Sequence, residues 1–357
     1  MLKKKVWLLG GFAMLLTPLA YALDNIPEDI SAWTEKGGVL STAPSIAWEE
    51  QNQIAVIGVS NVNGTYYLFY LAGFDGCWNA DGDANHQSVG LATSTDGINF
   101  TKHVSNPVLK PHDFLPVGSH EEGIRTGYVQ YVPSKNKFYG YFGVESPGGQ
   151  SSCDFGGGGA LCECNVSVDS SVYLATSDDG INWTIDGAVS GTYAAPGNEV
   201  YASGWVHDGT NFGLYVTTAE GGSNKAASKG ANPLSLNEFG GVPALSFGWS
   251  GVDAYLHDDN NTITLIYEPD GGIHPGANND NLYFATTHLD DMLNVQNERV
   301  VSTSGDERNI IFRDGSEWKW YYSDEADEYN NVIKLRTYPI ADLLPPKSPG
   351  NVTVSKP

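Results

Sequence analysis

The stretch GLATSTDGINF at residues 90–100 returns 83 residues later as YLATSDDGINW at residues 173–183. Each copy has alternating residues, then an Asp-Gly pair, then Ile-Asn and an aromatic residue. An Asp-Gly step supplies the positive φ of a two-residue hairpin turn, so each copy is predicted to be two strands joined by such a turn. A self-similar period of this length is typical of a repeat architecture, in which one supersecondary unit recurs along the chain.

The repeat extends beyond this hairpin. Five aromatic or β-branched segments recur at steps of 72, 74, 51 and 55 residues, each after a turn and another apolar strand. They are YYLFY at 66, FYGYF at 138, FGLYV at 212, ITLIY at 263 and WKWYY at 318. A third strand follows each segment, as in SVGLATS and SVYLATS. Five copies of a meander of about four strands predict an all-β fold, a five-bladed β-propeller.

The fifth copy ends at RTYPIADLL without an outermost strand, whereas the N-terminal part has a strand to spare. Residues 33–40, WTEKGGVL, are similar to FTKHVSNPVL at 100–109, the outer strand of the first copy. We therefore expect residues 33–40 to pair into the fifth blade and close the ring, which removes an exposed sheet edge. A loose N-terminal arm is the alternative.

Segments at both ends of the chain lie outside the repeat. Residues 1–22 have a basic start, an apolar run too short to span a membrane, and the small-x-small sequence Ala20-Tyr21-Ala22, as in a secretory signal peptide. Residues 23–344 form the predicted catalytic propeller. The Pro-rich residues 345–357 are typical of a linker or the start of a further module. We expect a secreted protein, extracellular or periplasmic, with no membrane span.

The chain is strongly acidic, with a formal net charge of −23. Loss of Lys3, Lys4 and Lys5 with the signal peptide leaves 16 basic residues against 42 acidic ones, a net charge of −26. Such a surface repels nucleic acid and anionic membranes, and it disfavours a polyanionic substrate unless the site is locally basic. Solubility is the plain explanation of the acidity, and no protein partner is indicated.

The four cysteines are Cys77, Cys153, Cys162 and Cys164, an even set that predicts two disulfides in an exported chain. Because one residue separates Cys162 from Cys164, a bridge between these two is geometrically awkward. We therefore expect Cys77 to be bridged to Cys162 or Cys164, clamping the loops of blades one and two. A zinc site is the alternative, although the spacing lacks a paired C-x-x-C.

The innermost strands of a propeller converge on its axis, so the residues that enter them come together from distant parts of the chain. Aligning the blades on these strands puts Glu122 and Glu199 at one position, each six residues before an aromatic residue. Blade one offers Glu49 and Glu50. Facing carboxylates suit glycoside cleavage, because one protonates the leaving oxygen while another, ionised, activates water or attacks carbon. Surface acids are the alternative, and the shared position singles out Glu122 and Glu199.

Residues near the same strand entries, or in the loops between the second and third strands, are candidates for substrate binding. Exposed aromatic rings are platforms for sugar rings, and loops carry specificity. The candidates are His120, Arg125, Trp78, Trp249, Asp253, His274 and Arg308. Trp78 packing beneath its own loop is the alternative for that residue.

No cofactor is expected to be required, and the sequence leaves a metal site open. Asp81, Asp83 and Asn85 alternate as in a calcium loop. No Glu closes that pattern at the twelfth position, so a structural calcium is only an alternative here.

The phrases NGTYYLFY, GLATSTDGINFTK and NPVL resemble those of the five-bladed propeller glycosidases, which include glycoside hydrolase families 32, 43, 62, 68, 117 and 130. The resemblance covers roughly residues 33–343. It implies carboxylate catalysis at the entries of the innermost strands in the first three blades, by Glu50 or a neighbour, Glu122 and Glu199.

The chain departs from the family phrases at several points. The Asp-Pro and Glu-Gly-Pro phrases of family 43 are absent, and of the Arg-Asp-Pro phrase of families 32 and 68 only Arg125 remains. A resemblance to family 117 allows a histidine as the acid, which keeps His120 and His274 as candidates. The fold is therefore better supported than any single family.

These observations predict a secreted glycoside hydrolase acting on an oligo- or polysaccharide by carboxylate acid/base catalysis. A carbohydrate-binding propeller without turnover is one alternative. A polysaccharide lyase that uses Arg125 with a Tyr or His base on an acidic sugar is another.

Overall fold

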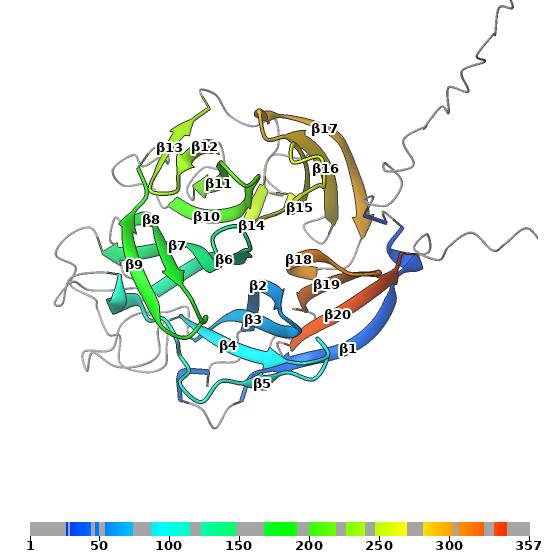
Figure 1. Cartoon of the computed structure of the whole chain (residues 1–357), viewed down its shortest axis with the longest axis horizontal. Coiled ribbons are helices and arrows are strands. Elements are labelled where there is room, and N and C mark those ends of the chain that lie inside the picture. Colours follow the sequence, from blue (N-terminus) through cyan, green and yellow to red (C-terminus); the bar gives the residue numbers. More distant parts are fainter. Residues whose placement is uncertain are drawn as a thin grey trace, which may run out of the picture.

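The computed structural model describes residues 26–27, 29–43, 47–49, 54–73, 87–114, 123–147, 168–190, 200–218, 226–239, 247–269, 281–302, 306–324 and 332–340. Five four-stranded antiparallel sheets surround one axis (Figure 1). The predicted all-β, five-bladed propeller is confirmed. The signal peptide, the C-terminal tail, the four cysteines and the Asp81–Asn85 loop lie outside the described residues.

Each blade is a meander that begins near the axis and ends at the rim (Figure 1). Blade one is β2 (Ile54–Val62), β3 (Thr65–Ala72), β4 (Ser88–Ser94) and β5 (Thr101–Lys102). Blade two is β6 (Gly123–Val132), β7 (Lys137–Pro147), β8 (Val168–Ser177) and β9 (Trp183–Ala188). Blade three is β10 (Val200–His207), β11 (Phe212–Thr218), β12 (Ala226–Asn232) and β13 (Ser235–Glu238).

Blades four and five complete the ring. Blade four is β14 (Phe247–Leu256), β15 (Thr262–Pro269), β16 (Leu282–His288) and β17 (Asp291–Ser302). Blade five is β18 (Asp306–Asp314), β19 (Glu317–Asp324), β20 (Val332–Pro339) and, from the N-terminal part, β1 (Thr34–Ser41). The described residues also include three short 3-10 helices, η2 (Ile30–Ala32), η3 (Ala47–Glu49) and η4 (Pro111–Asp113).

The N-terminal strand closes the ring as predicted. β1 pairs antiparallel with β20, and Leu40 lies opposite Ile333. Trp33, just before β1, packs edge-on against Trp320 of β19 with 5.3 Å between ring centroids. The strand therefore covers the outer edge of β20 and joins both ends of the described chain in one sheet.

The predicted two-residue turn of the repeated motif is wrong. Residues 95–100 connect β4 to β5, and residues 178–182 connect β8 to β9. The Asp96 carboxylate accepts the backbone N–H groups of Ile98 and Asn99, both at 2.8 Å. An Asx loop thus replaces the tight turn, because the aspartate side chain supplies the acceptors that a two-residue hairpin would take from the opposite strand.

The innermost strands approach one another too closely for side chains at two glycines. A Cβ atom on Gly58 of β2 would lie 2.1 Å from the carbonyl oxygen of Val129 on β6. A Cβ atom on Gly204 of β10 would lie 2.5 Å from the carbonyl oxygen of Val252 on β14. Glycine is therefore required where neighbouring blades meet backbone to backbone.

Candidate functional site

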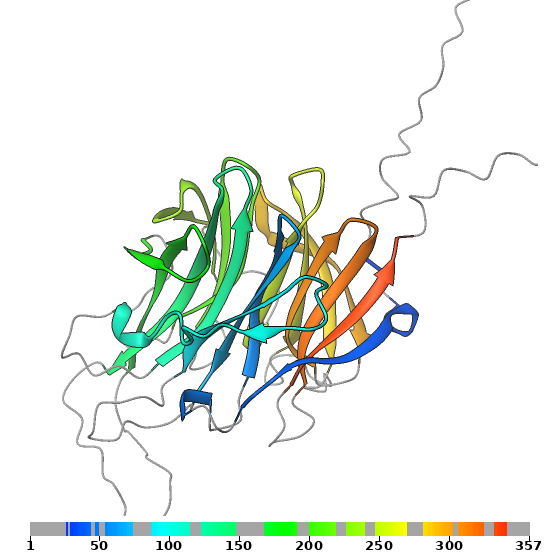
Figure 2. The ribbon, with the colours of Figure 1, turned by 60° about the horizontal axis from the view of Figure 1, so that its bottom comes forward.

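The five innermost strands give the axis two distinct ends (Figure 2). We call the end where β2, β6, β10, β14 and β18 begin the entry end, and the end where they finish the exit end. Short turns at the exit end connect the first strand of each blade to the second. The connections from the second strand to the third leave at the entry end, where the sequence predicts the site.

The predicted carboxylates come shortly before innermost strands in the sequence. β6 begins at Gly123 and β10 at Val200, so Glu122 and Glu199 each directly precede the innermost strand of their blade. Glu50 lies four positions before β2. These three glutamates, with His120, Trp78 and His274, lie outside the described residues, as does the side chain of Trp249. Their roles stay predictions.

The alignment of blades two and three that paired these glutamates agrees with two contacts between the blades. Trp205 Nε1 donates to the Tyr128 carbonyl at 2.8 Å, and Gln130 Nε2 donates to the Trp205 carbonyl at 2.6 Å. Tyr128 and Trp205, the aromatic residues used for the alignment, therefore lie side by side on neighbouring innermost strands.

Glu49, the neighbour of Glu50, is buried and makes contacts that stabilise the fold. Its side chain is fully buried and forms an ion pair with Lys102 of β5. It also accepts hydrogen bonds from the Tyr70 hydroxyl at 2.8 Å and the Ala43 N–H at 3.0 Å. Burial, followed by the nearby Glu49 charge, raises the pKa of Tyr70 well above its usual value. These contacts tie η3 to blade one and leave Glu50 as the candidate acid of this segment.

All five innermost strands are irregular toward the entry end. Each register with the second strand skips at least one residue, as in a β-bulge. Bulges bend a strand and re-aim side chains, often beside active sites. The residues that these registers skip include Ile57, Arg125, Ser203, Gly204 and Arg308. Two of the predicted substrate-binding residues, Arg125 and Arg308, thus stand at bulges.

The structure brings Arg125 and Arg308 together across the axis. Arg308 Nη2, from blade five, donates to the backbone carbonyl of Arg125 in blade two at 3.1 Å. Blade one lies between these two blades in the ring, so this contact joins two blades that are not neighbours (Figure 1). Sequence reasoning proposed both residues without foreseeing their contact, because the bulges that set their direction have no signature in the repeat.

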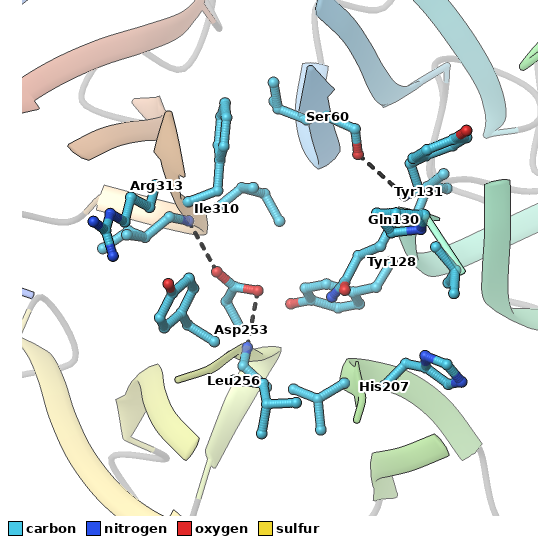
Figure 3. Close-up of a pocket in the computed structure, with 18 of the residues that line it drawn as sticks. Ser60, Tyr128, Gln130, Tyr131, His207, Asp253, Leu256, Ile310 and Arg313 are labelled. Carbon is cyan, nitrogen blue, oxygen red and sulfur yellow. Dashed lines mark hydrogen bonds between the residues drawn. The ribbon is translucent and has the colours of Figure 1, made fainter. Parts of the chain in front are cut away.

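Asp253, another predicted binding residue, lies in a cavity of about 510 Å³ lined by the exit halves of the innermost strands (Figure 3). Its carboxylate accepts the N–H groups of Ala254 at 2.9 Å and Ile311 at 3.1 Å. Burial raises the pKa of Asp253 to about 7, although both N–H groups favour the ionised form. The carboxylate links β14 to β18.

Other polar and aromatic side chains of this cavity were missed from the sequence. They include Ser60, Tyr128, Gln130, His207, Tyr255 and Arg313. Ser60 Oγ accepts the Tyr131 N–H at 3.1 Å. His207 Nδ1 accepts the Gly209 N–H at 3.2 Å, and its Nε2 is buried without a partner. These residues lie toward the ends of the aligned innermost strands, and this shared position in the alignment could have predicted them.

The described residues give no metal centre. Within the ranges given above, no three His, Cys, Asp or Glu side chains are grouped as ligands of an ion. None of the helices in the described part of the chain has the length and apolar character to cross a membrane.

No protein family model and no curated protein matches this sequence. Solved structures do match its fold. A glycosyl hydrolase from Bacteroides ovatus has a TM-score of 0.57 at 12% identity, covering 88% of this chain and 96% of that chain. An α-L-arabinofuranosidase of family 43 from Clostridium thermocellum has a TM-score of 0.50 at 16% identity, covering 76% and 82%.

A third match is described under family 130, mannoside phosphorylases among which are glycoside hydrolases that target β-1,2 mannosidic linkages in Candida mannan. Its TM-score is 0.52 at 12% identity, covering 94% of this chain and 99% of that chain. These likenesses show a five-bladed propeller fold shared with carbohydrate-active enzymes of families 43 and 130. At such identities they show the fold alone.

Proposed function

We propose that this protein is a secreted glycoside hydrolase that cleaves an oligo- or polysaccharide at the entry end of the axis. The observation that carries the proposal is the position of Glu122 and Glu199, each directly before the innermost strand of its blade in neighbouring blades. The fold shared with carbohydrate-active propellers supports it. Residues 1–22 would direct export, and a bridge from Cys77 to Cys162 or Cys164 would brace the adjoining loops.

In the proposed mechanism one carboxylate acts in its protonated form and another in its ionised form. Carboxylates that share a site repel each other when both are ionised, which keeps a proton on one of them. The protonated member, from the pair Glu122 and Glu199, gives its proton to the leaving oxygen. The ionised member activates water or attacks the sugar carbon, and Glu50 is the proposed third carboxylate. Arg125 and Arg308 would hold the substrate.

The test is a screen of plant, algal and microbial glycans for released reducing ends, followed by variants. Replacing a catalytic acid or base with Gln keeps the shape and removes proton transfer, so Glu122→Gln and Glu199→Gln should each lose on the order of a hundredfold in turnover. Glu238→Gln, on the exposed outermost strand of blade three, is the matched control. Thermal unfolding should be similar in all three variants.

Three results would count against the proposal. Near-normal turnover in both variants would show that the catalytic residues are elsewhere. Binding of an oligosaccharide without any hydrolysis would indicate a carbohydrate-binding propeller. An unsaturated product that absorbs in the near ultraviolet would indicate a lyase.

A further inference from the structure

We infer that the entry end of the axis recognises an anionic group through the guanidinium of Arg308. The group is an oxyanion, either a carboxylate or sulfate carried by a sugar or free inorganic phosphate. The inference builds on the proposed function, since it names a chemical feature of the ligand at the same end of the axis.

The guanidinium of Arg308 has hydrogen-bonding capacity that the protein does not use. Its Nη2 donates to the Arg125 carbonyl at 3.1 Å, while its Nη1 is buried and has no partner. Among the described residues, no carboxylate forms an ion pair with Arg308. A guanidinium is always charged and offers five N–H donors, so burying one of its nitrogens without a hydrogen-bond partner is costly. An anion would provide the acceptor that Arg308 Nη1 lacks.

The backbone at Arg308 is held in a conformation that arginine rarely adopts. Five non-glycine residues of the described chain have positive φ: Asn63, Asn136, Asn260, Asn297 and Arg308. Asparagine tolerates this region because its short side chain can hydrogen-bond locally, whereas for a long side chain it is an outlier. The φ of Arg308 is 50°, and the residue has no paired partner on β19. Strain and bulges of this kind mark functional positions.

Two hydroxyl groups at the bulges of other innermost strands also lack partners. Thr126 Oγ1, next to Arg125 on β6, and Ser203 Oγ, in the bulge of β10, are buried without a hydrogen bond. Hydroxyl and guanidinium donors together suit the several acceptor oxygens of an oxyanion. A buried guanidinium N–H without a carboxylate partner favours an anion over a neutral ligand.

The test measures binding by titration calorimetry at constant ionic strength on the full mature protein. The probes are methyl β-glucuronide, glucose 6-sulfate and inorganic phosphate, with methyl β-glucoside as the neutral counterpart. Wild type should bind at least one anionic probe about tenfold or more tightly than the neutral one, as charge-assisted hydrogen bonds require. Preference for a sugar anion indicates an acidic glycan, and preference for phosphate alone indicates free phosphate as the ligand.

Variants assign the preference to Arg308. Arg308→Gln should abolish the difference between anionic and neutral probes, and Arg308→Lys should retain part of it because the charge remains. Arg313→Gln is the matched control, since Arg313 stands on the same strand, pairs with Asp258 at 3.0 Å and lies at the exit end. Equal binding of all probes by wild type, or a preference that survives Arg308→Gln, would overturn the inference.

A second measurement, the melting temperature, distinguishes a role of Arg308 in anion binding from a role in holding the fold together. Arg308→Gly relieves the positive φ, so it should leave the melting temperature unchanged or raise it while anion binding is lost. A large fall in melting temperature would instead mean that Arg308 is held in place to support the fold. Hydrolysis of a neutral glycan without anion preference would reject only this inference. Anion binding without hydrolysis of any glycan would reject only the proposed function.

Discussion

The two ends of the axis are formed by the same five strands, but they differ in how their polar groups are satisfied. At the exit end, Ser60 accepts the Tyr131 N–H and Asp253 accepts the Ile311 N–H, although His207 Nε2 is buried there without a partner. At the entry end, bulges interrupt the strands and buried atoms of Thr126, Ser203 and Arg308 have no partner. Satisfied groups stabilise a fold, while unsatisfied ones remain available to a ligand.

A substitution where the innermost strands approach closely should give the largest loss in the free energy of unfolding. In Gly204→Val, the new side chain would collide with the backbone of β14, which cannot move without opening the interface between blades. We expect a loss of about 4 kcal/mol or more in the free energy of unfolding. Chemical denaturation measures it. Gly209→Ala is the control, because a Cβ there meets open space and only its φ of +94° is unfavourable.

That control should lose about 1 kcal/mol, the cost of placing alanine at positive φ. Equal losses in the two variants would show that backbone conformation, and not the contact between β10 and β14, sets the cost. Such a result would count against tight backbone packing between neighbouring blades.

The ion pair of Glu49 should give the next largest effect. Lys102→Met leaves a fully buried carboxylate without its charged partner, which costs about 3 kcal/mol in the free energy of unfolding. Lys137→Met is the control, because Lys137 and Asp178 form an exposed pair worth less than about 1 kcal/mol. The double variant Lys102→Met with Glu49→Gln should recover part of the loss. Catalysis by Glu49 would be indicated if the double variant were as stable as wild type yet inactive.

Asp253 should make the exit end sensitive to pH. Its pKa is raised to about 7 in the folded protein and lies near 4 in the unfolded chain, so the folded state binds the extra proton between these values. Stability should therefore fall as pH rises, by about 2 kcal/mol between pH 5 and pH 7. The measurement is the free energy of unfolding at each pH for wild type and Asp253→Asn.

The informative quantity is the difference between these two proteins, because other carboxylates titrate in both. The difference should change by about 2 kcal/mol over this range in the direction that favours Asp253→Asn at pH 7. A constant difference would show that Asp253 keeps an ordinary pKa, as a well-hydrated carboxylate would. The exit cavity would then be more open to water than the burial of Asp253 indicates.

The sequence contained the architecture but not the finer placement of side chains. Repeated phrases carried the blade number and even the closing strand, because strand periodicity and burial recur in every copy. The turn after Ser94 was mispredicted because the Asp96 side chain, rather than the Asp-Gly backbone alone, organises the loop. The Arg308–Arg125 contact was unpredictable, since a bulge depends on the competing registers of paired strands. Glu122 and Glu199 directly precede strand starts in the sequence, and their roles stay predictions.

The smallest expected effect compares single hydroxyl groups at the two ends. Ser60→Ala at the exit end removes the acceptor of the Tyr131 N–H and should cost about 1 kcal/mol in the free energy of unfolding. Thr126→Val at the entry end removes a buried hydroxyl that has no partner. The free-energy cost of burying that hydroxyl without a hydrogen bond is then removed. We expect this variant to be as stable as wild type or more stable by up to about 1 kcal/mol. The opposite signs follow from one rule, since a polar group stabilises a folded chain only when its bond to water is replaced. Equal losses in both variants would mean that Thr126 is satisfied in the folded protein, and the contrast between the two ends would then rest on Ser203 and Arg308.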